Sequence, residues 1–333
     1  MNKKAIVLLS GGLDSMLAIK VLQEQGIEVV AMNFYIEFAV CGGSGNEGAA
    51  QKAARMLNVP LTTVDITEEY LEMFKNPKHG YGANINPCID CKIFMLKKAK
   101  ERMQEVGASF LVTGEVLGER PMSQRKDALD IIERDAGVRG ILLRPLSAKL
   151  LVPTIPEKEG VVDREKLLDI SGRSRKPQME LAEKYGIKEY PNPAGGCLLT
   201  DPGFSNRIKD LIQHDELTLE NLKLLKCGRH FRLSSSTKIV VGRDDKDNSI
   251  VEAEAKDGDI CMRLKDYPSS FAILRGPDAD KLIDEAAKIV AYHTKFRNEK
   301  NLRVDYWKMP SSAHVTISAQ PATLADVDSV RIK

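Results

Sequence analysis

The chain has 333 residues, of which 43% are hydrophobic and 29% are charged, with a formal net charge of +2. The length predicts two or three domains, and the composition predicts a folded, soluble protein. So small a net charge does not point to a nucleic-acid partner, and an RNA surface would have to be a local patch. No apolar run approaches the roughly 18 residues of a membrane span, and the N-terminal apolar run is too short for a secretory signal. We therefore expect a cytoplasmic protein without a membrane partner.

Strand-like and helix-like segments alternate over the first 200 residues. Strands are expected at 5–9, 28–34, 61–65, 110–113 and 141–144. Helical patterns lie between them, including 46–57 and 92–106. This alternation predicts an α/β fold with a doubly wound parallel sheet. In such sheets the ligand binds at the carboxyl ends of the strands.

The pattern changes in the last third of the chain. A helix over 172–186, a Pro/Gly-rich loop over 190–197 and a helical stretch over 204–225 lead into it. Beyond them, short strands, one helix and a last strand are expected at 238–242, 260–264, 278–297 and 315–317. We therefore expect two domains, 1–203 and a smaller α+β domain at 204–333. Cys227 and Cys261 have no cysteine at short spacing, and we interpret them as core residues.

The segment Ser10-Gly11-Gly12-Leu13-Asp14-Ser15 joins the first predicted strand to the first predicted helix. The first amides of a helix lack intrahelical partners, the helix dipole is positive there, and glycines allow close approach. Such a turn binds phosphate, although the Lys-Ser/Thr ending of a Walker A loop is missing. The segment resembles the PP-loop of ATP pyrophosphatases, which cleave ATP between its alpha and beta phosphates. Phosphate contacts are expected from Ser10, Gly11, Gly12, Leu13 and Ser15, with Mg²⁺ between the phosphates and the carboxylate of Asp14.

Three of the six cysteines fall in the first predicted domain at informative places. Cys88 and Cys91 form a Cys-x-x-Cys pair just before a basic helix, and Cys197 ends the Gly-rich loop. In a cytosolic chain such thiols indicate metal binding or catalysis rather than disulfides. The spacing alone leaves four alternatives open: ordinary thiols, a redox pair, a zinc site with Cys41 as fourth ligand, or an iron–sulfur cluster.

A third motif, Val112-Thr-Gly-Glu-Val-Leu-Gly-Glu-Arg-Pro-Met-Ser-Gln124, begins at the end of a predicted strand. Together with the PP-loop and Leu143-Arg-Pro-Leu146, it resembles the PP-loop domain of the tRNA 4-thiouridine synthetase family over roughly residues 1–200. The resemblance implies an adenine-nucleotide alpha-hydrolase fold. It also implies a tRNA sulfurtransferase that adenylates a tRNA uridine with ATP and replaces the activated oxygen with sulfur, giving 4-thiouridine.

Four further residues are candidates for nucleotide contacts. Gly114 would let the sheet edge approach the nucleotide, and Arg144 would neutralise phosphate or RNA charge. Met32 and Phe34 end the second strand and would border the adenine, although plain core packing explains them equally well.

The chain departs from the larger members of that family. The PP-loop lies at its start, and we recognise no rhodanese-like domain in it. Cys88, Cys91 and Cys197 instead look like the set that holds a [4Fe-4S] cluster in minimal, cluster-dependent tRNA thiolases. The resemblance then implies that these cysteines and Asp14 are catalytic. Sulfide or a sulfur-donor protein would supply the sulfur, and a homodimer is left open.

The second predicted domain resembles the RNA-binding NFACT-R domain. Lys226-Cys-Gly-Arg-His-Phe-Arg-Leu233 and Lys238-Ile-Val-Val-Gly-Arg243 carry this shorter match. RNA contacts are expected from Arg229, Arg232, Lys238 and Arg243. A solvated basic face is the alternative, and we assign Phe231 to the core.

Two other functions remain open at this point. A PP-loop amidating or ligating enzyme would adenylate a small molecule without sulfur. A non-catalytic RNA-binding protein would have kept the ATP-binding fold without its activity. The intact PP-loop argues against this alternative.

Overall fold

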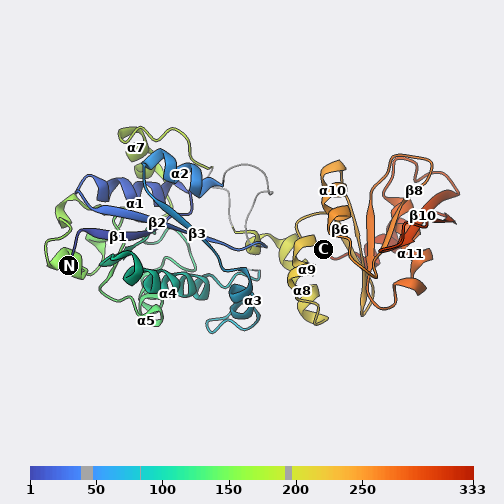
Figure 1. Cartoon of the computed structure of the whole chain (residues 1–333), viewed down its shortest axis with the longest axis horizontal. Coiled ribbons are helices and arrows are strands. Elements are labelled where there is room, and N and C mark those ends of the chain that lie inside the picture. The colour runs from blue at the N-terminus through green and yellow to red at the C-terminus, as the bar shows by residue number, and fades with distance from the viewer. Residues whose placement is uncertain (39–47, 83, 192–196) are drawn as a thin grey trace. The chain divides into compact units, whose positions relative to one another are not determined.

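The computed structural model describes residues 1–38, 48–82, 84–191 and 197–333. The described chain divides into two compact units, Met1–Cys197 and Leu198–Lys333 (Figure 1). The expected fold class is confirmed, because the first unit carries a parallel sheet with helices and the second a separate antiparallel sheet.

The sheet of the first unit has five parallel strands in the order β3-β2-β1-β4-β5. The strands are β1 Lys4–Leu8, β2 Glu28–Tyr35, β3 Leu61–Asp65, β4 Phe110–Val112 and β5 Leu142–Leu143. The strand order reverses direction at β1, which pairs with β2 on one side and β4 on the other. Ligands of such sheets bind at this reversal, outside the carboxyl ends of the strands.

Helices cover both faces of this sheet, α1, α2 and α7 on one and α4 and α5 on the other (Figure 1). Their bounds are α1 Leu13–Gln23, α2 Ala49–Leu57, α4 Cys88–Val106, α5 Lys126–Ala136 and α7 Lys176–Lys184. Two short helices, α3 Thr67–Lys75 and α6 Ile155–Lys158, and two 3₁₀ turns, Ala148–Leu150 and Arg164–Lys166, complete the unit. Alternate residues of β1 enter opposite cores, Ala5 and Val7 under α1 and Ile6 under α4 and α5.

Two helix starts differ from the sequence prediction. Helix α4 begins at Cys88, four residues before the expected start, so both cysteines of the pair lie in its first turns. Pro87 is the residue at the N-cap position of that helix and makes no capping hydrogen bond with its side chain. Helix α7 begins at Lys176, not at 172, because Gly172 has a φ of +82° and Pro177 starts the first turn.

The second unit contains a six-stranded antiparallel sheet in the order β11-β10-β8-β9-β7-β6. The strands are β6 Arg229–Ser234, β7 Thr237–Val241, β8 Ile260–Leu264, β9 Ala272–Arg275, β10 Leu302–Lys308 and β11 Val315–Ala319. The helices are α8 Pro202–Gln213, α9 Leu219–Leu224, α10 Asp245–Ala253, α11 Ile283–Tyr292 and α12 Leu324–Val330, with 3₁₀ turns at Leu198–Thr200 and Ala279–Lys281. The expected single helix over 204–225 is two helices, because Asp215 has a φ of +54° and Thr218 caps α9.

The core assignments in this unit are confirmed. Phe231 is fully buried, and Cys227 and Cys261 are buried in one cluster with Val240 and Ile273. Among the residues described, no helix is long and apolar enough to cross a membrane.

Candidate nucleotide and thiol site

The PP-loop leaves β1 and enters α1, which begins at Leu13 with Gly12 as its N-cap. Its own hydroxyl groups brace the turn. The Ser15 hydroxyl donates to the Gly12 carbonyl at 2.7 Å, and the Gly12 amide donates to Ser10 Oγ at 3.3 Å. The start of α1 therefore lies at the carboxyl end of β1, where its unpaired amides and dipole favour an anion.

Two glycines let other segments pack directly on this loop. A Cβ on Gly11, whose φ is +81°, would lie 2.4 Å from the carbonyl carbon of Ala49 at the start of α2. A Cβ on Gly114 would lie 2.4 Å from the carbonyl carbon of Asp14. Real Cβ atoms do not approach this closely, so both positions require glycine. Gly114 thus serves the approach of the 112–124 motif to α1, and its contact with a nucleotide remains a prediction.

Asp14 lies among charged residues that the sequence interpretation did not select. Its side chain is 23% exposed, and Oδ1 is 3.6 Å from Nη2 of Arg175. Burial raises the pKa of Asp14, although Arg175 and Arg120 oppose that shift. Burial and the charge of Asp14 likewise raise the pKa of Glu119. The nearby arginines therefore do not fully offset the cost of burying these two carboxyl groups in their charged form.

Several polar atoms at this place have no hydrogen-bond partner among the described residues. They are Asp14 Oδ1, Arg175 Nε and both amide atoms of Gln178. Gln178 is fully buried and close enough to Asp14 to affect its pKa, yet it makes no well-formed hydrogen bond there. Buried polar groups are normally satisfied. An orphaned carboxylate oxygen and an orphaned guanidinium nitrogen fit a divalent cation and a phosphate.

The missed residues carried a signal in the sequence. Glu119 and Arg120 lie inside the 112–124 motif, and Arg175 directly precedes α7. Nothing in their spacing from the PP-loop indicates that they meet Asp14, since the sheet topology brings them together.

The Cys-x-x-Cys pair opens α4 beside a buried tyrosine. Tyr70 is almost completely buried, and the Cys91 thiol lies close enough to influence its pKa. Burial raises the pKa of Tyr70, and Cys91, Cys197 and Cys88 raise it further. All three thiols of the predicted set therefore lie close enough to one phenol to influence it.

Burial raises the pKa of both thiols in the pair, that of Cys91 to about 11. Among the described residues no three His, Cys, Asp or Glu side chains are spaced to hold a metal ion. Iron–sulfur clusters are held by cysteine thiolates, usually four of them, so a cluster on these three cysteines remains a prediction. Cys41, the fourth ligand of the zinc alternative, lies outside the described residues.

Arg120 links the thiols to the PP-loop. Its charge lowers the pKa of Cys88 and also that of Asp14. The loop that would hold ATP and the cysteine pair therefore share one neighbourhood of the first unit.

Arg144 is committed to internal ion pairs. Its side chain is 2% exposed, its Nε is 3.0 Å from Glu115 Oε2, and it also pairs with Glu133. Although burial raises the pKa of Glu115, Lys92 and Arg144 outweigh it and lower that pKa to about 2. A contact between Arg144 and a nucleotide remains a prediction.

Met32 is buried in the core beneath α4 and α5, and Phe34 packs against the same core. This placement accords with the core-packing alternative for both residues.

The four basic residues expected to bind RNA differ in how far their charged groups are exposed and free of other partners. Arg232 is 13% exposed and bonds to the carboxylates of Asp210 and Glu216. Lys238 is 2% exposed, and burial lowers its pKa to about 8. Its ammonium group is therefore not placed to contact phosphate, which corrects that part of the predicted patch. Arg229 and Arg243 are partly exposed, and Arg243 pairs with Asp247.

Comparisons with known proteins agree with this division of the chain. Residues 3–132 match the family model of the tRNA methyl transferase HUP domain, and residues 228–330 match that of the NFACT protein RNA binding domain. The tRNA-specific 2-thiouridylase MnmA of Syntrophotalea carbinolica is 33% identical over 34% of this chain and 34% of its own length. MnmA 1 of Caldanaerobacter subterraneus subsp. tengcongensis is 26% identical over 64% of this chain and 60% of its own length. The chain thus spans from about a third to 60% of the length of these relatives.

A crystal structure of a 4-thiouridine synthetase–RNA complex with bound ATP is 24% identical, with a TM-score of 0.34, over 55% of this chain and 51% of that one. The first unit is accordingly similar to the HUP domains of tRNA-modifying enzymes, and the second is similar to an RNA-binding domain.

Proposed function

We propose that the chain is an ATP-dependent tRNA sulfurtransferase that thiolates a uridine. One observation carries the proposal: beside the start of α1, Asp14 Oδ1 and Arg175 Nε are buried without hydrogen-bond partners among the described residues, which leaves bonding capacity for Mg²⁺ and a phosphate of ATP. The charge of Arg120 acts on both Asp14 and Cys88, which supports placing the sulfur chemistry near this site. The similarity to tRNA 2-thiouridylases supports a tRNA substrate.

The chemistry has two steps. The uracil oxygen attacks the alpha phosphate of ATP, an O–P bond forms, and pyrophosphate leaves with the electrons of the broken P–O bond. A sulfur nucleophile then attacks the activated ring carbon, a C–S bond forms, and AMP leaves with the oxygen. The amides at the start of α1 and the Ser10 and Ser15 hydroxyls would bind the phosphates, and Asp14 would hold Mg²⁺ against them.

The three thiols near Tyr70 are the proposed sulfur-handling residues. Cys88, Cys91 and Cys197 would hold one [4Fe-4S] cluster, which supplies an iron position that can carry sulfide. Their nearness to one phenol supports this proposal. A zinc site that includes Cys41 is the alternative, and metal analysis separates the two.

The second unit is the proposed tRNA-binding domain, with Arg229 and Arg243 as its phosphate contacts. Its similarity to an NFACT RNA binding domain supports this role. We propose that this domain begins at residue 204. We also propose that the protein is located in the cytoplasm. Sulfide or a donor protein is the proposed sulfur source, and a homodimer is left to measurement.

A thiolation assay tests the proposal directly. It combines anaerobically purified protein with unmodified tRNA, Mg²⁺, sulfide and ATP. We expect ATP-dependent formation of a thiolated nucleoside, and chromatography of the digested tRNA distinguishes 4-thiouridine from 2-thiouridine. Alanine at Cys88, Cys91 or Cys197 should abolish both thiolation and the cluster absorbance near roughly 400 nm, whereas Cys41→Ala should not. Pyrophosphate release without thiolation of any tRNA would favour an adenylating ligase. Stoichiometric zinc without iron or labile sulfide would overturn the cluster.

A further inference from the structure

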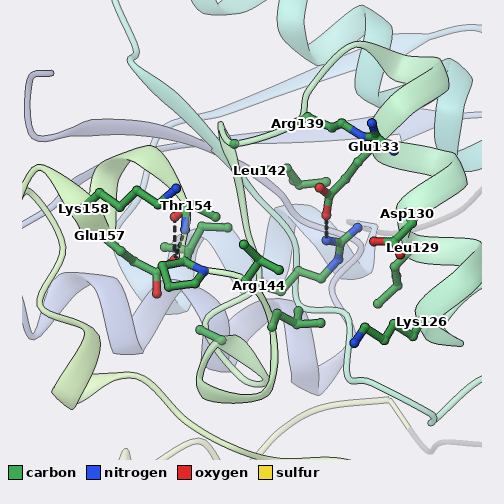
Figure 2. A pocket seen from close by; sticks show the side chains of 16 residues that line it. Lys126, Leu129, Asp130, Glu133, Arg139, Leu142, Arg144, Thr154, Glu157 and Lys158 are labelled. Atoms are coloured by element: carbon green, nitrogen blue, oxygen red, sulfur yellow. Dashed lines mark hydrogen bonds and ion pairs between the residues drawn. The ribbon is translucent and has the colours of Figure 1, made fainter.

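A pocket of about 540 Å³ lies beside the edge strand β5 of the first unit (Figure 2). Helix α5 with the residues that follow it and helix α6 form opposite walls, with Lys126 and Arg139 on one side and Thr154 and Lys158 on the other. Neither a PP-loop residue nor a cysteine is among its lining residues. Its volume is in the range of pockets that bind small molecules.

Unpaired positive charge dominates the rim of this pocket. Lys126, Arg139 and Lys158 are exposed, and none has an ion-pair partner within the part of the chain that the structure describes. Two lining carboxylates are already neutralised, Glu133 by Arg144 and Glu157 by Arg164. Asp130 is the remaining lining carboxylate, so three free cations face one anion.

The wall also contains a donor that is buried and unused. Arg144 lines the pocket and is 2% exposed, and its Nη2 has no hydrogen-bond partner among the described residues. A buried guanidinium nitrogen without an acceptor is costly, and an oxyanion in the pocket would satisfy it. Beside these cations stands an apolar wall that includes Val152, which is 77% exposed.

We propose that this pocket binds a phosphate group of a nucleotide, contacted by Lys126, Arg139 and Lys158, with the apolar wall facing the sugar or base. Lysine and arginine together are typical of phosphate recognition. The phosphate comes either from a free nucleotide or from an RNA strand, because both present the same chemistry. The proposal does not rest on thiolation, since the pocket contains neither Asp14 nor a thiol.

Lysine acetylation of the full chain, read by mass spectrometry, tests the site residue by residue. Lys126 and Lys158 are the reporters, and the exposed Lys97 and Lys188 of the same unit are internal controls. AMP and unmodified tRNA are the probes. We expect one of them to slow acetylation of both reporters about threefold or more, because a bound phosphate shields the ammonium groups, while the controls keep their rate. Protection by AMP identifies a free nucleotide, and protection by tRNA alone identifies an RNA strand.

A charge-matched pair of variants supplies the second arm. The triple variant Lys126→Gln, Arg139→Gln, Lys158→Gln should weaken binding of the protecting probe about tenfold and flatten its salt dependence. The control triple Lys3→Gln, Lys97→Gln, Lys188→Gln removes the same charge from exposed positions and should leave both unchanged. Equal losses in the two triples, or acetylation of Lys126 and Lys158 that neither probe slows, would overturn the proposal. Neither readout uses thiolation activity.

Discussion

Charged side chains around the PP-loop differ from two arginines of the second unit, Arg232 and Arg275, in how well their hydrogen-bonding atoms are satisfied. In the first unit Asp14 Oδ1 and Arg175 Nε are buried and make no hydrogen bond with the described residues. In the second unit Arg232 bonds to two carboxylates, and Arg275 bonds to Asp259 at 2.7 and 2.8 Å. The first pattern leaves bonding capacity for a ligand, and the second uses it to hold the fold.

This difference shows that a basic residue in a sequence does not by itself indicate a contact with a ligand. Buried polar groups are paired in native proteins, so an unpaired one needs an explanation. A cation and a phosphate at the PP-loop would supply it. The ion pairs of Arg232 need no such partner, because Asp210 and Glu216 already fill that role.

The largest effect is expected at Asp14. Asp14→Asn keeps the size of the side chain and removes its charge, so Mg²⁺ would lose a ligand and the phosphates their counter-charge. We expect pyrophosphate release to fall about 100-fold or more, the size typical of losing a preorganised electrostatic contact. The matched control is Asp127→Asn, an exposed carboxylate at the start of α5, which should keep wild-type turnover. Wild-type turnover of Asp14→Asn would show that Asp14 and its neighbours with unpaired atoms, Arg175 and Gln178, do not form the ATP site.

Arg232→Met should act on folding. The change removes the nearest cation from Asp210 and Glu216, and we expect the free energy of unfolding to fall by about 3 kcal/mol. Urea denaturation of the full chain, followed by a probe of the second unit, measures it. Arg303→Met removes an exposed pair with Asp266 and should cost about 0.5 kcal/mol or less. If both changes cost the same, the structural role of Arg232 is wrong.

Lys238 gives the second unit a stability that depends on pH. Its pKa is about 8 in the folded protein, against an ordinary 10.5. Between these values the unfolded chain binds more protons, so the free energy of unfolding should rise with pH, by about 3 kcal/mol over the window. Below pH 8 both states are protonated and this contribution is constant.

Lys238→Met should remove that rise, and denaturation at pH 7, 8, 9 and 10 measures the difference from wild type. The exposed Lys281→Met is the control and should retain the wild-type slope. A rise that survives in Lys238→Met would assign the pH dependence to other groups.

Arg175→Met tests whether the guanidinium of Arg175, whose Nε has no hydrogen-bond partner among the described residues, binds a nucleotide phosphate. Its loss should weaken ATP binding about tenfold, in the range of a charge-assisted hydrogen bond. Calorimetric titration with a non-hydrolysable ATP analogue measures the change. Arg125→Met removes an exposed arginine that pairs with Asp127, and its affinity should match wild type.

The smallest effect is expected at the partly exposed arginines of the second unit. The double variant Arg229→Gln, Arg243→Gln should lower the slope of log affinity for tRNA against log salt by about 0.7 to 0.9 for each phosphate that the protein no longer neutralises. Binding measured at four salt concentrations gives the slope. An unchanged slope would remove these two residues from the RNA surface and leave no member of the predicted patch in place.

The sequence by itself determined the alternating strands and helices, the parallel sheet and the place of the PP-loop after the first strand. These features depend on local periodicity and on turn chemistry that few residues permit. It also identified Phe231, Cys227 and Cys261 as core residues, because a lone aromatic in a predicted strand and cysteines without a partner at short spacing are most often packed inside.

Only the tertiary structure decided which charges meet. Arg120 and Arg175 approach Asp14 from segments more than 100 and 160 residues away in sequence. Lys238 is buried beside Glu216, although lysine is among the residue types most often exposed. Ion pairing and burial depend on what packs across the sheet, and local patterns do not carry that information because the partners come from distant parts of the chain.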